Sequence, residues 1–220
     1  MVAIGSYAGG QLSGSQAGQL SVYVGHKAGY GNKDSIEGNT FVGAFAGLGH
    51  SGGNSNVGVG YNCFEHTGHT NSTHNTVVGS SAMNRMTGSY NAAFGQGALG
   101  GGGGGAGGSD KNVAVGYSAL KSLNGSRGEN VAIGYEAGEA MTTGRQNILV
   151  GWKAGENLTT TLNSVFIGPN CGHSAGSYNI GMGYNVLAQN TGTGNVAIGH
   201  SIMESSTTAF QNVAVGAALN

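Results

Sequence analysis

The sequence predicts an all-β fold, a repetitive parallel β-solenoid of about 13 short coils, and three observations support it. A short phrase recurs along the whole chain with a period of about 18 residues. Within each copy, large apolar residues stand two positions apart in a Val/Ile-rich run, as in a strand with one buried face. Each copy then continues with a glycine bend, a small residue and a polar return segment. Because so short a strand cannot cover its own apolar face, neighbouring coils must stack on one another.

The strands are expected just before the glycine of each copy. Alignment on that glycine gives thirteen copies, at Gly5, Gly25, Gly43, Gly60, Gly79, Gly95, Gly116, Gly134, Gly151, Gly168, Gly183, Gly199 and Gly216. The residue before the glycine is large and apolar in all thirteen copies, for example Ile133, and we expect it to belong to the buried face.

A polar position recurs at the other end of the strand. Ten of the thirteen copies carry Asn four residues before the glycine, among them Asn112, Asn130, Asn147 and Asn195. Asn repeated at one phase can hydrogen-bond its own turn and the Asn one coil away, so we expect a ladder of amides along the rod.

Composition limits the classes of protein to which the chain can belong. It has only 8 Lys+Arg and 9 Asp+Glu among 220 residues, with a net charge of −1, which argues against a nucleic-acid groove or binding to an anionic membrane. Gly is frequent, at 46 residues, but lacks the strict triplet period of collagen. No apolar run is long enough for a membrane-spanning helix, and the start at Met1 does not have the pattern of a signal peptide.

The repeats keep their phase on both sides of a glycine-rich run at residues 100–108, which we interpret as an inserted exposed loop. We therefore expect a single solenoid domain over residues 1–220, and we interpret it as a fragment of a longer fibre, because Met1 occupies an Asn position and Asn220 cuts the last repeat short.

The phrase Asn-Val-Ala-Ile-Gly, followed by a small residue, resembles the head repeat of trimeric autotransporter adhesins, the YadA-like head. The copies with longer spacers that contain Thr-Gly are similar to repeats of bacteriophage tail-fibre proteins. The resemblance covers nearly the whole chain. It implies a left-handed parallel β-roll assembled as a homotrimer, with apolar strand residues partly facing the threefold axis. The long, uneven coils and the glycine run depart from the adhesin pattern and favour the tail fibre.

The resemblance also implies a function. We expect a structural and adhesion segment of a virion tail fibre, either a shaft or a receptor-engaging region, and not an enzyme. The alternative is the head of a bacterial surface adhesin or a subunit of an extracellular filament. Expected partners are other copies of the chain, other fibre or tail proteins and, as a further candidate, a glycan of the host surface. No cofactor, nucleic acid or membrane insertion is expected. An ice-binding solenoid would need flat Thr-x-Thr ranks, and the repeat positions of this chain carry Asn and Val instead.

The candidate binding residues form an aromatic stripe. The residue after the glycine is aromatic in five copies, at Tyr61, Tyr117, Tyr135, Trp152 and Tyr184. Rings on a weakly charged surface rich in Asn, Ser and Thr would suit stacking against sugars. The alternative is a packing ladder between coils or between protomers.

Histidines and cysteines give weaker candidates. His66, His69 and His74 could bind a transition metal, but their spacing fits no standard motif, and we favour solvated loop histidines. Cys63 and Cys171 both occupy the small-residue position three residues after their glycine, six coils apart. That separation, roughly 29 Å, excludes a disulfide, so we expect buried thiols.

One pair of carboxylates has the spacing that polysaccharide cleavage would need. Glu139 and Glu156 occupy the same position in adjacent coils, so their carboxylates should lie roughly 5 Å apart, as in a retaining glycosidase. However, Lys121 occupies the same position one coil earlier, and Lys153 lies beside Glu136. We therefore favour ladders of solvent-facing ion pairs over catalysis.

Overall fold

The computed structural model describes residues 1–12, 19–31, 37–50, 52–65, 72–101, 109–125 and 128–217, and these ranges contain 13 β-strands and no helix. The strands are β1 (Val2–Ile4), β2 (Val22–Val24), β3 (Thr40–Val42), β4 (Val57–Val59), β5 (Thr76–Val78), β6 (Ala92–Phe94), β7 (Val113–Val115), β8 (Val131–Ile133), β9 (Ile148–Val150), β10 (Val165–Ile167), β11 (Ile180–Met182), β12 (Val196–His200) and β13 (Val213–Ala217). Every strand except the last two ends at the residue before a repeat glycine, as predicted; β12 and β13 continue past theirs.

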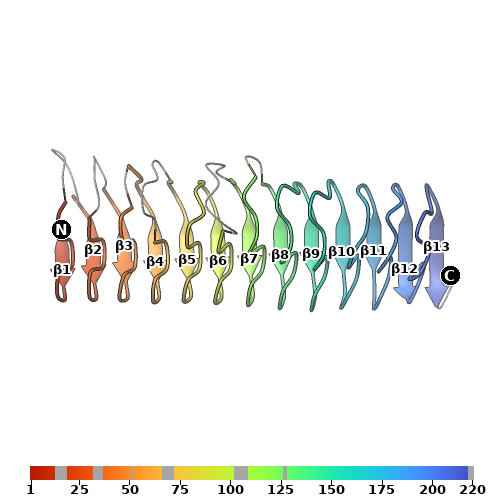
Figure 1. Cartoon of the computed structure of the whole chain (residues 1–220), viewed down its shortest axis with the longest axis horizontal. Helices are drawn as coiled ribbons and strands as arrows, with labels where there is room; N and C mark the ends of the chain where they lie inside the picture. Colours follow the sequence, from red (N-terminus) through yellow and green to blue (C-terminus); the bar gives the residue numbers. More distant parts are fainter. Residues whose placement is uncertain are drawn as a thin grey trace.

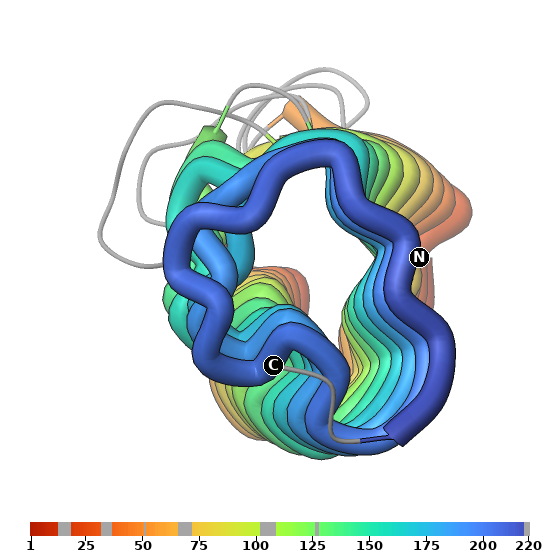
Figure 2. The backbone as a smooth tube through the Cα atoms, turned by 90° about the vertical axis from the view of Figure 1, so that its right-hand side faces the viewer, coloured from red at the N-terminus to blue at the C-terminus, as the bar shows by residue number. Residues whose placement is uncertain are grey.

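The strands form one sheet in sequence order, and each is parallel to the next. The register places equivalent residues of the repeat opposite one another, as where Val131 pairs with Val113 on one side and Ile148 on the other. Figure 1 shows the strands side by side along the rod, and Figure 2 shows the coils one behind another. The structure is thus a parallel β-solenoid with 13 strands and about 11 turns. The expected 13 coils match the number of strands and exceed the number of turns.

The interior of the solenoid is filled from the middle of each strand and from the bend that follows it. The middle residues Ala132, Leu149 and Phe166 are fully buried, and so are small residues of the bend such as Ala137 and Ala154. These side chains belong to one continuous core along the rod. Because every coil contributes at the same phase, the core repeats from coil to coil like the sheet itself.

The first and third residues of each strand lie on the outside, and we call the surface that they form the strand face. Ile133 is 40% exposed, Ile148 42% and Ile180 41%. The expectation that the residue before the glycine is buried within the chain is therefore wrong. Successive strand residues point to opposite sides, and the one that points inward is the middle residue, which ranges from Gly and Ala to Leu and Phe. The larger β-branched residues point away from the core.

The predicted amide ladder is confirmed, and it is buried. Asn130 donates from Nδ2 to Asn112 Oδ1 at 3.2 Å, and Asn147 repeats the contact with Asn130 Oδ1 at 3.1 Å. The same oxygen of Asn130 also accepts the backbone N–H of Asn147 at 3.1 Å. Further along, Asn195 donates to Asn179 Oδ1 at 3.1 Å. Each amide therefore ties one coil to the next.

Serine replaces Asn in part of this ladder without breaking it. Ser164 donates its backbone N–H to Asn147 Oδ1 at 3.1 Å, and its hydroxyl accepts the N–H of Asn179 at 3.2 Å. Between coils the hydroxyl supplies the same acceptor as the amide, but it does not reproduce the amide's two side-chain donors.

Replacement of Asn130 by Ala is expected to destabilise the rod by about 3 kcal/mol, which would lower the melting temperature by roughly 10 °C. The change removes the acceptor for the Asn147 N–H and the donor that reaches the Gly144 carbonyl at 3.0 Å, both in buried surroundings. Asn130→Ser is the matched control and should lose less than half as much, since Ser164 fills the equivalent place. Thermal unfolding at one fixed protein concentration measures both. Parent-like melting of Asn130→Ala would refute the role given to the ladder.

The repeat glycines form a column at which adjacent coils approach closely. The backbone angle φ lies between 137° and 142° at Gly116, Gly134, Gly151 and Gly199. Residues that carry a side chain rarely adopt this conformation. A Cβ on Gly134 would collide with the backbone carbonyl of Gly151 in the next coil. Both the conformation and the space therefore require glycine at this column.

Candidate binding surface

The aromatic stripe lies on the surface, directly after the strands. Its five rings are between 43% and 57% exposed, at Tyr61, Tyr117, Tyr135, Trp152 and Tyr184. Their position follows from the repeat, because each comes one residue after a repeat glycine.

Several of these rings use a face to contact a neighbour. The rings of Tyr117 and Tyr135 are stacked, with centroids 5.1 Å apart and planes 12° from parallel. Tyr184 stacks on His200 at 5.3 Å. The ammonium of Lys153 lies 5.2 Å from the centre of the Trp152 ring. The packing ladder that the sequence left open thus exists between coils, and it leaves only part of each ring surface for a sugar.

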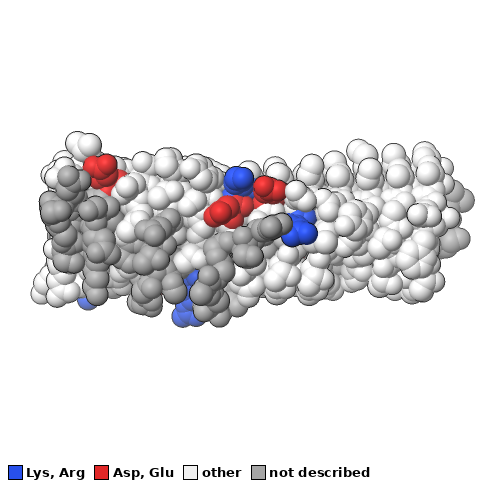
Figure 3. Space-filling model, turned by 90° about the horizontal axis from the view of Figure 1, so that it is seen from above, with Lys and Arg blue, Asp and Glu red and all other residues white. Residues whose placement is uncertain are grey.

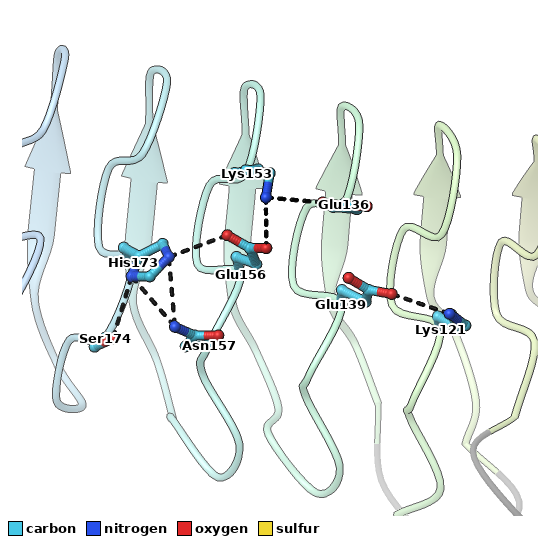
Figure 4. Close-up of polar contacts among 8 residues, drawn as sticks. All are labelled: Lys121, Glu136, Glu139, Lys153, Glu156, Asn157, His173 and Ser174. Carbon is cyan, nitrogen blue, oxygen red and sulfur yellow. Dashed lines mark hydrogen bonds and ion pairs between the residues drawn. The ribbon is translucent and has the colours of Figure 1, made fainter.

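The charged residues beside the stripe form a network of ion pairs (Figure 4). Lys153 Nζ lies 3.1 Å from Glu136 and 2.8 Å from Glu156, and the other oxygen of Glu156 lies 3.0 Å from His173 Nε2. One coil earlier, Lys121 pairs with Glu139 at 3.0 Å. The predicted ladder of ion pairs is therefore present across three successive coils, and the contact between Glu156 and His173 extends the polar network to a fourth.

The proposed carboxylate pair is also as close as the sequence predicted. Oxygens of Glu136, Glu139 and Glu156 lie within 4.8 Å of one another. Burial acts to raise the pKa of Glu136, but hydrogen bonds from Lys153 and Tyr135 outweigh it and lower the pKa below the usual value. The same hydrogen bond to Glu136 raises the pKa of Tyr135. The geometry is that of carboxylates held as ion-pair partners, since Lys153 bridges Glu136 and Glu156.

Only one of the three metal-candidate histidines falls within the described ranges. His74 is exposed, and its ring stacks on Tyr90 with centroids 5.1 Å apart. His66 and His69 lie outside the described residues, as does the part of the glycine-rich run from 102 to 108. The metal hypothesis therefore stays a prediction.

The prediction of buried thiols is confirmed. Cys63 and Cys171 are free and fully buried. Burial raises the pKa of each thiol to about 12. Little reactive thiolate is therefore present at neutral pH.

We expect neither thiol to react with a disulfide reagent such as DTNB in the folded protein at pH 8, because both are protonated and shielded. In guanidinium chloride, 2 thiols per chain should react. Rapid reaction of the folded protein would contradict the placement of these residues.

Sequence reasoning missed two separate hollows beside the stripe, which we together call the groove. The residues two positions after the repeat glycine form one column, and those five and six positions after it form a second column. Two hollows lie along these columns. The first, of about 380 Å³, is lined by Ser81, Asn84, Arg85, Gly97, Gly100, Gly101, Lys121 and Ser122. The second, of about 190 Å³, is lined by Asn170, His173, Asn185, Ala188, Gln189 and Glu204. Between the hollows, the same columns carry the ion pairs of Figure 4.

Charge is distributed unevenly along the rod. Seen from above, Lys, Arg, Asp and Glu lie near the middle and at the N-terminal end, and none is visible over the β10–β13 end (Figure 3). In the sequence, Glu204 is the only one of these residues after Glu156. The surface of the last coils is therefore polar but almost uncharged.

Within the described residues, no helix has the length and apolar character needed to cross a membrane. Comparison of the chain with protein-family models, curated proteins and solved structures gives no match.

Proposed function

We propose that the chain is a structural and adhesion segment of a bacteriophage tail fibre, in which three copies pack side by side through their strand faces as a left-handed β-roll. The observation that carries the proposal is the exposed strand face. It follows the whole rod and includes Ile133, Ile148 and Ile180, each about two-fifths exposed.

The location of the apolar surface, rather than its total amount, supports assembly. The chain exposes 9089 Å², close to the roughly 9,300 Å² expected of a globular monomer of 21.8 kDa. The strand face, however, is roughly 60 Å long and 7 Å wide, or on the order of 400 Å². That is the size of the largest apolar patch on a typical monomer, and such patches are often functional.

A second copy of the same chain fits this face best. The face has a regular repeat, because the strands are in register over all 13 layers, so an identical rod presents the same ridges and gaps. The number three comes from the resemblance to trimeric adhesin heads and tail fibres. A closed ring of three copies would shield every strand face at once.

The remaining surface suits mechanical work outside a cell. A low charge makes the rod insensitive to salt, and 8 Lys+Arg in 220 residues leave few sites for trypsin. In the described sheet only β1 and β13 have an unpaired edge, which limits lateral aggregation. Other fibre or tail proteins would then be its axial partners.

The head of a bacterial surface adhesin would use the same architecture, and the location of the chain separates the two proposals. Gold-labelled antibodies against the purified chain should decorate a fibre in electron micrographs of virus particles. Labelling of a bacterial envelope without particles would overturn the tail-fibre proposal and support the adhesin.

If the aromatic stripe engages the host, replacement of both Tyr135 and Trp152 by Ala should lower adsorption of the purified chain to host cells by at least tenfold. Each ring is nearly half exposed, so its loss should leave the rod's melting temperature within a few degrees of the parent. Thr160→Ala, at an exposed position away from the stripe, is the control. Unchanged adsorption would mean that the stripe serves only packing and that this segment is a shaft.

A further inference from the structure

The second hollow of the groove, which lies beside the bends after β10, β11 and β12, has features that the rest of the groove lacks. We call it the amide pocket and define it by Asn170, His173, Asn185, Ala188, Gln189 and Glu204. We propose that the amide pocket binds one sugar residue of a neutral polysaccharide or oligosaccharide. This inference rests on the proposed adhesion role and names the ligand class and its place on the rod.

The lining groups match the chemistry of sugar hydroxyls. Each hydroxyl both donates and accepts a hydrogen bond, and the side-chain amides of Asn170, Asn185 and Gln189 offer both functions. The Glu204 carboxylate adds a strong acceptor. It is held in place by Asn185, which donates from Nδ2 to Oε1 at 3.3 Å.

Neighbouring contacts hold the opposite wall in position. His173 Nε2 lies 3.0 Å from Glu156, and Nδ1 lies 3.3 Å from the hydroxyl of Ser174. Glu156 is itself paired with Lys153 at 2.8 Å. A wall fixed in this way loses little side-chain entropy when a ligand binds.

Charge determines which sugars fit. The pocket contains one carboxylate and no Lys or Arg, so it offers an acidic sugar no permanent positive charge and one negative charge that repels it. The first hollow differs, since both Arg85 and Lys121 line it. Between the two hollows, ion pairs occupy the columns. The amide pocket is therefore the part of the groove suited to a neutral ligand.

Size determines how much of the ligand is held. At about 190 Å³ the pocket is smaller than the roughly 300–1,000 Å³ of typical small-molecule sites. It would hold a single sugar residue, while the rest of the saccharide lies over the open groove. Binding should be weak at each site and strengthened when several copies engage one surface.

The test measures binding of the purified full chain to an array of immobilised neutral and acidic oligosaccharides. The variant Asn185→Gly/Gln189→Ala removes two amides, and glycine preserves the left-handed backbone at 185, where φ is 54°. Thr160→Ala is the matched control. We expect wild-type binding to neutral sugars, at least a tenfold loss in the double variant, and no change in the control.

Retention of binding by the double variant would overturn the proposal, and so would wild-type binding confined to acidic sugars. Measurement of molecular mass on the same samples separates this proposal from the preceding one. A trimer that binds no neutral sugar would overturn the pocket and leave the fibre intact. A monomer whose binding is lost in the double variant would support the pocket and contradict the fibre.

Discussion

Replacement of Leu149 by Asp is expected to abolish folding. Leu149 is the middle residue of β9, fully buried in the solenoid, and it lies between Ala132 and Phe166 of the adjacent strands. A carboxylate there would have neither water nor a partner, and the cost exceeds about 4 kcal/mol. Circular dichroism should show loss of the β-sheet signal.

The neighbouring substitution Ile148→Asp is the control and should have a different outcome. Ile148 is 42% exposed on the strand face, so its carboxylate can reach water in a single chain. The solenoid should keep its β-sheet signal, but the protein should no longer assemble. Ile133→Asp, at the equivalent face, should behave in the same way. Equal loss of structure in the Leu149 and Ile148 variants would contradict the assignment of inside and outside.

Replacement of Gly134 by Ala is expected to lower stability by about 4 kcal/mol, or roughly 10 °C in melting temperature. The new Cβ would collide with the Gly151 carbonyl, and φ at this position is 142°. Neither problem can be relieved alone, because the backbone that would have to move also pairs with the next coil.

Gly97→Ser is the matched control for this effect. A Cβ there would meet nothing closer than Ser118 Oγ at 3.7 Å. Ser81 and Ser118 already occupy the equivalent position in the adjacent coils, with φ near 54°. The change should cost about 1 kcal/mol, the ordinary cost of a side chain in this left-handed conformation. A similar loss in both variants would show that the glycine column is not a point of close approach.

Much of the fold could be predicted from the sequence because it depends on period alone. The position of the glycine defined the 13 strands, and the recurrence of Asn before Val131 and its equivalents predicted the buried ladder. The small-residue position of Cys63 and Cys171 predicted their burial. These features need only that equivalent residues stack, which any in-register solenoid provides.

Which face of each strand points into the core could not be predicted in the same way. Alternation separates two faces but does not say which one is inside, and the more apolar face, with Ile133, was assigned to the interior. In a chain that folds alone, the more apolar face of a strand is normally the buried one. Here the residue inside β8 is Ala132, and the apolar face with Ile133 lies outside.

The candidate site was predicted in part for a similar reason. Stacking between Tyr117 and Tyr135 follows from their shared position in consecutive coils, and so does the pairing of Lys121 with Glu139. The groove depends on two positions whose residue types vary from coil to coil. Asn170 and Lys153 occupy the same column, but Asn170 lines a hollow whereas Lys153 forms ion pairs. No residue type recurs along the column, so the sequence contains no repeated signal for the groove.

The mass of the purified protein in solution tests the central claim, that the exposed strand face is covered by other copies of the chain. Sedimentation equilibrium at micromolar concentration should give about 65 kDa, three times the 21.8 kDa of one chain. The Ile148→Asp variant should give the mass of one chain with its β-sheet signal intact. A parent protein that sediments as a folded 21.8 kDa monomer would contradict the account.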